Sequence, residues 1–419
     1  MRASIKDQLY CFREYSGCLC YFVNLSVAKF PDFLKNVNFD LIIFHTTLLS
    51  DRFAGSRLES AKGMEFICKE LASIEHLKQS DTVKIALPQD EWFFIDAVNY
   101  IINEFGINFV CTVAPESEWK KIFYNVDFAK VKFAQVLTGY LAPETLKEIN
   151  SMEEKIKEKT IDIGYRARKS PYCLGRLGFL KTTIADVFST NSKKYALKTD
   201  ISLKEEDTFL GSDWYEFLLK CKYIIGVEGG ASLMDKDGTI WERTNNYLKQ
   251  HPNAEFEEVE SEIFPGMDGK LHNVAISPRH LECCATKSCQ ILVEGEYNGI
   301  LKPDIHYIPV KMDFSNIDEV LQTVADDDRR EAIVDAAYRD IVSSGKYTYK
   351  SYVELIIKES LPLGNNESKK LSNKEKLLYY VNILREFLNM RKIQAVAVLL
   401  KHFPSLRNTL FKLSMKVKK

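Results

Sequence analysis

The chain has 419 residues, of which 46% are hydrophobic, and its formal net charge is −1. This composition is typical of a globular protein rather than a disordered one, and the length suffices for two domains and an appendage. Because the net charge is close to zero, the overall charge gives no reason to expect binding to nucleic acid. No window reaches the roughly 18 apolar residues of a membrane span.

The first 158 residues are predicted to form one α/β domain. Short apolar runs predict four strands, at 20–25, 40–45, 83–87 and 108–113. Helical patterns fall between and after them, at 62–78, 91–105 and 144–159. Strands that are apolar on both faces and alternate with helices are typical of a parallel sheet covered on both sides.

The same alternation begins again in residues 159–361. Further strands are predicted at 161–165, 222–227, 274–276 and 290–293. Helices are predicted at 178–189, 213–220, 241–250, 278–286, 316–344 and 347–360. Two consecutive α/β units of similar size predict two doubly wound, Rossmann-like domains that face each other across a cleft.

Residues 362–419 are predicted to form a basic helical extension, with two helices divided at Pro404. From Lys369 to Lys419 there are 13 Lys or Arg and 2 Glu, a net charge of +11, which leaves −12 for the rest of the chain. Basic residues interleaved with Leu and Phe suit helices that lie on an anionic inner membrane surface. The alternative is a helical pair packed on the acidic body of the chain, or on a second subunit in a homodimer.

Ten cysteines are scattered along the chain, and the first residues lack the apolar core of a signal peptide. Reduced thiols in a cytoplasmic protein, peripheral to the membrane if the extension binds there, are therefore expected. Neither the pair Cys18 and Cys20 nor the group Cys283, Cys284 and Cys289 has the paired spacing of a zinc module. We therefore predict no metal site.

Ligands of open parallel sheets bind beyond the carboxyl ends of the strands, so the residues that follow each strand are the candidates. In the first domain these are His45, after the strand at 40–44, and Asp90 and Glu91, after the strand at 83–87. Each could serve as a general base. The structural alternatives are a buried core histidine and acidic residues that cap a helix.

In the second domain, Arg166 and Arg168 follow the first strand, and Lys181 lies in the next helix. These cations are candidates for binding phosphate, or are surface residues paired with acids. Glu228, Gly229 and Gly230 follow a buried strand, where glycines permit close approach to a ligand or form a tight turn. Two further acids, Glu294 and Glu296, follow the strand at 290–293.

The segment 277–282 carries the strongest signal. Ser277 is a good N-cap and Pro278 a good first helical residue, so Arg279 falls in the first turn, where the helix dipole favours an anion. Glu282 lies one turn further on and can reach a hydroxyl-rich group beside that anion. A phosphate-binding cation next to a carboxylate suits a nucleotide-sugar site.

Several segments together resemble the donor domain of GT-B glycosyltransferases, specifically bacterial proteins of the "glycosyl transferases group 1" kind, which build surface polysaccharides. They are 163–168, 175–178 with Lys181, 226–232, 277–282, 294–303 and 306–309. The first half is similar to the acceptor domain through 44–45, 88–91 and 109–112, and the resemblance covers about residues 20–340.

The resemblance implies transfer of a sugar from a nucleotide-activated donor to a glycan or lipid-linked glycan in cell-surface polysaccharide or lipopolysaccharide synthesis. Arg166, Arg168, Lys181 and Arg279 would neutralise the diphosphate, without a metal cofactor. Glu282 matches the second Glu of the family's Glu-x7-Glu element, which holds the ribose, but the first position of that element is Val274.

The resemblance leaves the outcome at the anomeric carbon open. An inverting enzyme would need a base, for which Asp90 ranks before Glu91 and His45.

Two other functions compete with this one. The segment Asp235-Lys236-Asp237-Gly238 resembles the first motif of haloacid-dehalogenase-like phosphatases, in which Asp235 would be the nucleophile and Mg²⁺ would be bound. The same residues are also favourable in a turn. A non-catalytic protein that binds a sugar nucleotide is the third alternative, and it would be indifferent to loss of the candidate bases.

Overall fold

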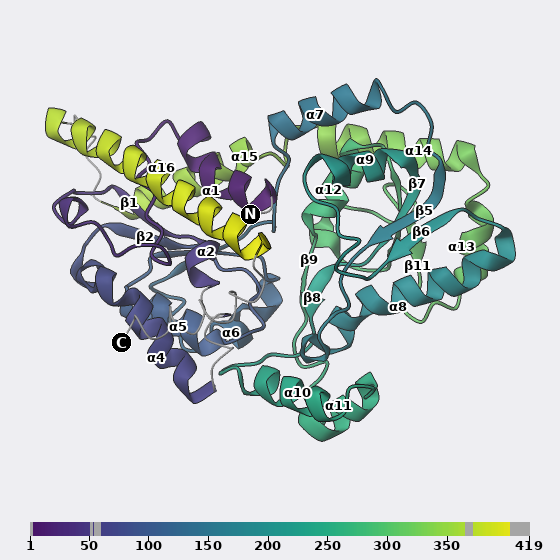
Figure 1. Ribbon diagram of the computed structural model, residues 1–419, viewed down its shortest axis with the longest axis horizontal. Coiled ribbons are helices and arrows are strands. Elements are labelled where there is room, and N and C mark those ends of the chain that lie inside the picture. The colour runs from purple at the N-terminus through teal and green to yellow at the C-terminus, as the bar shows by residue number, and fades with distance from the viewer. Residues whose placement is uncertain (1–2, 51–52, 54–59, 365–371, 403–419) are drawn as a thin grey trace.

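The structure is a computed structural model, and it describes residues 3–50, 53, 60–364 and 372–402. Two parallel sheets, each flanked by helices, form two bodies that lie side by side (Figure 1). The predicted fold class, two Rossmann-like domains with a helical extension, is thereby confirmed.

The first sheet has four parallel strands in the order β1-β2-β3-β4. They are β1 (Leu41–Phe44), β2 (Val83–Ala86), β3 (Phe109–Thr112) and β4 (Lys132–Gln135). The helices in this part of the chain are α1 (Ala3–Tyr15), α2 (Thr46–Leu49), α4 (Ser60–Leu71), α5 (Ile95–Glu104) and α6 (Trp119–Ile122). Every residue of the two central strands is buried, as expected for a sheet covered on both faces.

Two predictions for this domain differ from the structure. Residues 20–25 form no strand, although they are apolar, because they lie in an irregular segment between α1 and β1. Strand β4 was not predicted, because it is an edge strand with Lys132 and Gln135 at its ends and no residue fully buried. Edge strands need fewer apolar residues, so their sequence signal is weaker.

The second sheet has five parallel strands in the order β11-β10-β7-β5-β6. They are β5 (Ile161–Arg166), β6 (Thr199–Ser202), β7 (Cys221–Gly226), β10 (Cys289–Val293) and β11 (Ile308–Val310). The edge strands β6 and β11 are short and were not predicted. From β5 the chain continues to β6 on one side and to β7 on the other, so the topological switch point lies between β5 and β7.

The helices in this part of the chain are α7 (Pro143–Glu153), α8 (Gly175–Asn191), α9 (Ser212–Lys220), α12 (Pro278–Ala285), α13 (Ile317–Thr323) and α14 (Asp327–Ala337). Between β7 and α12 the chain forms β8 (Gly229–Ala231), α10 (Thr239–Gln250), α11 (Phe256–Ile263) and β9 (Asn273–Ala275). Strands β8 and β9 pair with each other antiparallel, apart from the main sheet to which 274–276 was predicted to belong.

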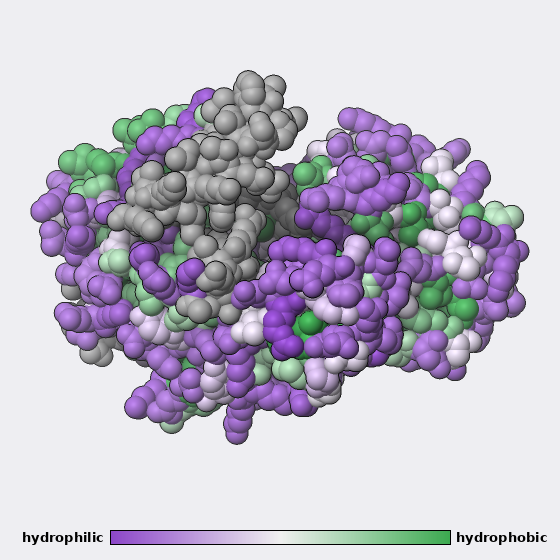
Figure 2. Space-filling view, turned by 60° about the horizontal axis from the view of Figure 1, so that its bottom comes forward, coloured by the Kyte–Doolittle hydropathy of each residue, from purple (hydrophilic) through white to green (hydrophobic). Residues whose placement is uncertain are grey.

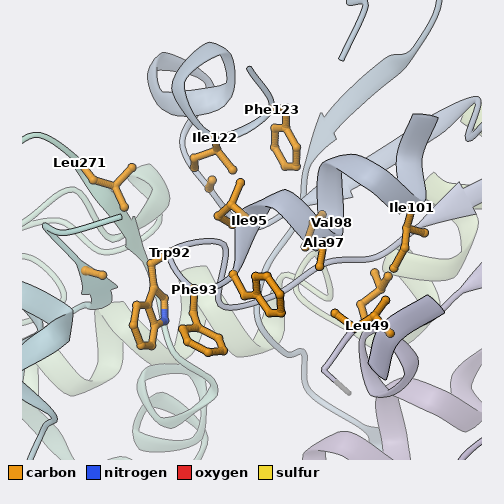
Figure 3. Packing of buried hydrophobic residues seen from close by; sticks show 14 of the residues in the cluster. Leu49, Trp92, Phe93, Ile95, Ala97, Val98, Ile101, Ile122, Phe123 and Leu271 are labelled. Carbon is orange, nitrogen blue, oxygen red and sulfur yellow. The ribbon is translucent and has the colours of Figure 1, made fainter. Parts of the chain in front are cut away.

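Residues of the two domains pack together in hydrophobic clusters, of which the largest lies between β2 and the β8–β9 region. Trp92 and Phe93 of the first domain pack in it with Leu271 of the second (Figure 3). The main chains are joined directly as well, because Asp235 N donates to Trp92 O at 2.7 Å and Asp96 N donates to Lys236 O at 2.9 Å. The positions of the two sheets are thus fixed by apolar burial and by backbone hydrogen bonds.

The C-terminal helices return to the first domain. Tyr352 and Val353 of α15 (Tyr349–Ser360) pack with Phe109 of β3, and α15 contacts α1. Helix α16 (Asn373–His402) crosses the same domain beside α1 (Figure 1), where Glu386 pairs with Arg13 at 2.6 Å. The first domain therefore includes α15, which the sequence pattern assigned to 159–361. The helix break predicted at Pro404 lies outside the described residues.

Candidate functional site

Arg279 lies at the switch point of the second sheet. It is in the first turn of α12, as predicted, and its Nη2 donates to the main-chain oxygen of Arg166, the last residue of β5, at 2.5 Å. The next residue, His280, makes a ring-nitrogen contact of 3.2 Å with the main-chain oxygen of Val227, just past β7. The start of α12 is thus tied to the carboxyl ends of both strands that flank the switch point.

Two aromatic rings hold the Arg279 guanidinium. Its central carbon lies 5.2 Å from the ring centre of Tyr165 and 5.4 Å from that of Trp214. Trp214 also donates from its indole nitrogen to Glu282 Oε2 at 2.8 Å. Burial raises the pKa of Glu282, so the predicted ribose-binding carboxyl is held beside the cation in a poorly solvated place. Tyr165 and Trp214 were not among the predicted site residues, because aromatic residues in a strand and a helix usually belong to the core.

Lys181 is the second cation at this place. Its main-chain oxygen accepts a hydrogen bond from the Tyr165 hydroxyl at 3.2 Å, which sets this turn of α8 against the end of β5. Burial lowers the pKa of Lys181, and the charge of Arg279 lowers it further. Within the described ranges, neither Lys181 nor Arg279 forms an ion pair with a carboxylate. Two like charges that lie near each other and form no ion pair favour a bound anion.

Asp90 of the first domain lies near Lys181, because its charge raises the pKa of Lys181. Asp90 is exposed and has a φ of 55°, in the left-handed region that non-glycine residues seldom adopt. The loop after β2 thus brings a carboxylate of one domain near a cation of the other. Of the predicted residues, the structure brings together Asp90, Lys181 and Arg279, with Glu282 beside Arg279.

Glu91 lies in the core rather than at the surface. It is fully buried, and its Oε1 accepts from Thr112 Oγ1 at 2.6 Å and from Val113 N at 3.0 Å. Burial raises the pKa of Glu91 to about 7. The carboxyl group therefore joins the loop after β2 to the end of β3, where an acceptor hydroxyl does not reach it.

His45 caps α2. Its Nδ1 accepts from the Thr47 main-chain N–H at 3.2 Å, and burial lowers its pKa to about 4. In the neutral ring the proton is then on Nε2, which is buried and has no partner. His45 in this state is a hydrogen-bond donor rather than a base.

Arg166 and Arg168 differ from the phosphate-binding role predicted for them. Arg166 turns toward β6, where it binds Asp200 Oδ1 at 2.7 Å and lies over the rings of Phe209 and Phe217. Its other contacts are to main-chain oxygens. Arg168 is exposed and pairs with Glu205 at 3.0 Å. Arg166 thus joins β5 to β6, and Arg168 forms an ion pair at the surface.

The carboxylate of Glu228, after β7, joins its loop to the loop that follows β10. Glu228 accepts hydrogen bonds from the main-chain N–H groups of Glu296, at 3.0 Å, and Tyr297, at 2.5 Å. Glu294 is exposed, and Glu296 lies 3.3 Å from His272.

The glycines beside Glu228 serve the β8–β9 ribbon. A Cβ at Gly230 would collide with the Asn273 main-chain oxygen, and one at Gly229 would lie 3.4 Å from that of Ala275. Gly230 is therefore needed for the close approach of strand β9, whereas a Cβ at Gly229 would make an ordinary van der Waals contact with it.

Asp235 contradicts the phosphatase alternative. Its carboxylate is fully buried and accepts from the main-chain N–H groups of Gly238, Ile240 and Trp241 at 2.8 to 3.3 Å. A carboxylate occupied in this way caps the start of α10 and cannot act as a nucleophile.

In the described part of the chain, no group of three or more His, Cys, Asp or Glu residues could hold a metal ion. None of the helices described is long and apolar enough to cross a membrane.

No family model matches the sequence, and no curated protein does. Among solved structures, the chain is similar to Anabaena HepE in complex with UDP-glucose, with 8% identity, 77% of this chain and 78% of that one covered, and a TM-score of 0.40. It is also similar to TarM of S. aureus, at 16% identity, 70% and 53% coverage and a TM-score of 0.36. A third similar structure is the pneumococcal O-GlcNAc transferase GtfA, with 11% identity, 72% of this chain and 55% of that one covered, and a TM-score of 0.33. The chain spans about half the length of the last two.

The fold and the site define the class of the protein. It is a two-domain α/β protein with a pair of cations at the switch point of its second sheet and a carboxylate of the first domain near one of them.

Proposed function

We propose that the chain is a glycosyltransferase that takes a sugar from a nucleoside diphosphate donor. The observation that carries this proposal is the pair Lys181 and Arg279, which lie near each other where doubly wound sheets bind nucleotides and form no ion pair with a carboxylate among the described residues. The diphosphate would bind between them and the start of α12, and Glu282 would accept a hydrogen bond from the ribose.

In the inverting form of the reaction, an acceptor hydroxyl attacks the anomeric carbon while its proton passes to the Asp90 carboxylate. The bond between that carbon and the phosphate oxygen breaks, and the diphosphate leaves with the electron pair. Lys181 and Arg279 stabilise the charge that develops on it, so no metal cofactor is needed. A retaining outcome would use Asp90 to orient the acceptor instead.

The acceptor that we propose is a glycan or lipid-linked glycan of cell-surface polysaccharide or lipopolysaccharide synthesis. The basic segment 369–419 supports a position on the inner face of the cytoplasmic membrane, because it pairs positive charge with apolar residues. In α16 one side packs on the chain's own first domain, where Arg385 binds Lys29 O, and this leaves its other side for the membrane or for a second subunit.

Thermal shift tests the donor site. The full chain is melted with UDP, GDP, dTDP, CMP or ADP, with and without Mg²⁺. A ligand at 100 times its Kd adds about 2.7 kcal/mol to the free energy of unfolding, so the true donor nucleotide raises the Tm by several degrees. Arg279→Ala and Lys181→Ala abolish the shift, and Arg168→Ala, an exposed cation outside the site, keeps it.

The possible results distinguish a glycosyltransferase from a non-catalytic binding protein. A metal-independent shift that Arg279→Ala removes supports the donor site and names the nucleotide. No shift with any nucleotide contradicts the proposal. A shift without sugar transfer, unchanged in Asp90→Asn, favours a non-catalytic protein that binds sugar nucleotides.

A further inference from the structure

A cavity of about 1230 Å³ lies in the first domain along the edge strand β1. All four residues of β1 line it, and the other walls come from α1, the irregular segment before β1, and α16. Small-molecule sites are typically about 300–1,000 Å³, and protein interiors hold few voids larger than a water molecule. A space of this size is therefore large enough for a ligand and too large for a packing defect.

The walls of this cavity are mostly apolar. Among the side chains that line it are Leu9, Phe22, Leu25, Phe30, Leu34 and Ile42. Leu25 and Ile42 are half-buried and line this space, and both also pack against the hydrophobic cluster of the first domain. The acidic Glu386 in the wall is neutralised by Arg13, 2.6 Å away. Such walls favour hydrocarbon over a charged or sugar-like ligand.

One polar group in the wall lacks a partner. His45 lines the cavity at the carboxyl end of β1 and is 7% exposed. Because Nδ1 accepts from Thr47 N, the neutral ring carries its proton on Nε2, which is shielded from solvent, and no group among the described residues accepts that hydrogen. A buried donor without an acceptor is costly, so an oxygen of a bound molecule is the expected partner.

We propose that this cavity holds the hydrocarbon chain of the acceptor, and that an oxygen of its head group accepts a hydrogen bond from His45 Nε2–H. The inference rests on the proposed glycosyl transfer and names its acceptor class, an amphiphile with an acyl or isoprenyl chain. Strands β1 and β2 are parallel, with Phe44 beside Ala86 in register. The head group at His45 is therefore at the edge of the sheet where Asp90 follows β2.

Helix α16 connects the cavity with the surface. Asn389 and Met390 line the cavity, whereas Leu377 is 63% and Leu384 59% exposed on another side of the helix. The exposed apolar side chains of α16 are Leu377, Tyr380, Val381, Leu384, Phe387 and Leu388. Most of the coloured surface in Figure 2 is hydrophilic; hydrophobic residues lie at the upper left, at the end of the domain that α16 crosses, and in further patches on the other domain. A helix that is apolar toward solvent beside an apolar cavity indicates a membrane as the source of the chain.

The test uses dansyl-labelled undecanoic acid, whose fluorescence rises when its chain leaves water. Titration of the full chain is expected to give saturable binding. Leu25→Glu and, as a second variant, Ile42→Glu put a charge in the cavity and weaken binding at least tenfold. Leu384→Glu is the matched control, because it puts the same charge on the outer side of α16, and it leaves binding unchanged. His45→Asn keeps an N-cap for α2 but removes Nε2–H, and it weakens binding about tenfold or more.

Melting curves confirm that each variant is folded. The proposal is overturned if the probe does not bind, or if Leu384→Glu abolishes binding while Leu25→Glu and Ile42→Glu leave it intact. The nucleotide shift of the same preparation reports on the donor site separately. Probe binding without a nucleotide shift supports hydrocarbon binding in the cavity and contradicts the proposed glycosyltransferase function. A nucleotide shift without probe binding supports the glycosyltransferase function and contradicts hydrocarbon binding in the cavity.

Discussion

Arg279 Nη2 lies 2.5 Å from the main-chain oxygen of Arg166, so two arginines that the sequence assigned to one anion have separate roles at the end of β5. Arg166 points toward β6 and binds Asp200. Arg279 points to the switch point and is held there by Tyr165 and Trp214. The main chain of one arginine thus positions the side chain of the other.

This arrangement predicts opposite effects for two matched substitutions. Arg166→Met removes a buried guanidinium with hydrogen bonds to Asp200 and to main-chain oxygens, and we expect a loss of about 2 kcal/mol in the free energy of unfolding. Nucleotide affinity should stay within about threefold. Arg279→Met should lower nucleotide affinity at least tenfold with a smaller loss of stability. Urea unfolding and calorimetric titration of both variants check this, and equal loss of affinity would refute the separation of roles.

Asp90→Asn tests the proposed general base. An amide cannot take the proton of the acceptor hydroxyl, so we expect kcat to fall by roughly 10²- to 10⁴-fold. Because Asp90 is exposed and lies in the other domain from the nucleotide, the Kd of the nucleotide should change little. The measurement is transfer of a radiolabelled sugar at saturating donor. Activity within threefold of the wild type would exclude Asp90 as the base.

The central strands could be predicted because they are short, apolar on both faces and separated by helices. The edge strands β4 and β6 could not, because they carry polar residues such as Lys132 and Asp200, and nothing local distinguishes them from loops. The return of α15 to the first domain is a long-range contact with β3, and no signal within residues 349–360 reveals it.

The start of α12 was predictable because capping residues and Arg279 are adjacent in sequence. The roles of Arg166 and Gly230 depend on neighbours that lie far along the chain, Phe209 for the arginine and Asn273 for the glycine. A residue at a strand end is a candidate for binding by position alone, and only its contacts show whether the sheet already uses it. For the same reason the sequence could not show that Glu91 is buried.

Glu91→Gln should change how stability depends on pH. Burial raises the folded-state pKa of Glu91 from 4.5 to about 7, so between these values the folded chain holds a proton that the unfolded chain has lost. Stability from this group is therefore lost as the pH rises from 4.5 to 7, by at most about 3 kcal/mol. A glutamine keeps an oxygen for Thr112 and Val113 but does not titrate.

We expect Glu91→Gln to melt at a higher temperature than the wild type at pH 8, with a smaller difference at pH 5. Scanning calorimetry of both proteins from pH 4.5 to pH 8 measures this. A constant difference in Tm across that range would show that the Glu91 pKa is not raised.

His45→Asn should change how stability depends on pH below pH 6.5. Burial lowers the folded-state pKa of His45 from 6.5 to about 4, so between these values the unfolded chain takes up a proton that the folded chain does not. The wild type therefore loses stability as the pH falls from 6.5 to 4, by at most about 3 kcal/mol from this group. Asparagine still caps α2, but it has no titrating ring. The decline in Tm between pH 6.5 and pH 4.5 should therefore be shallower in His45→Asn than in the wild type, as measured by circular dichroism. Parallel declines in the two proteins would mean that His45 is protonated in the folded chain and is not the neutral donor inferred from its contact with Thr47.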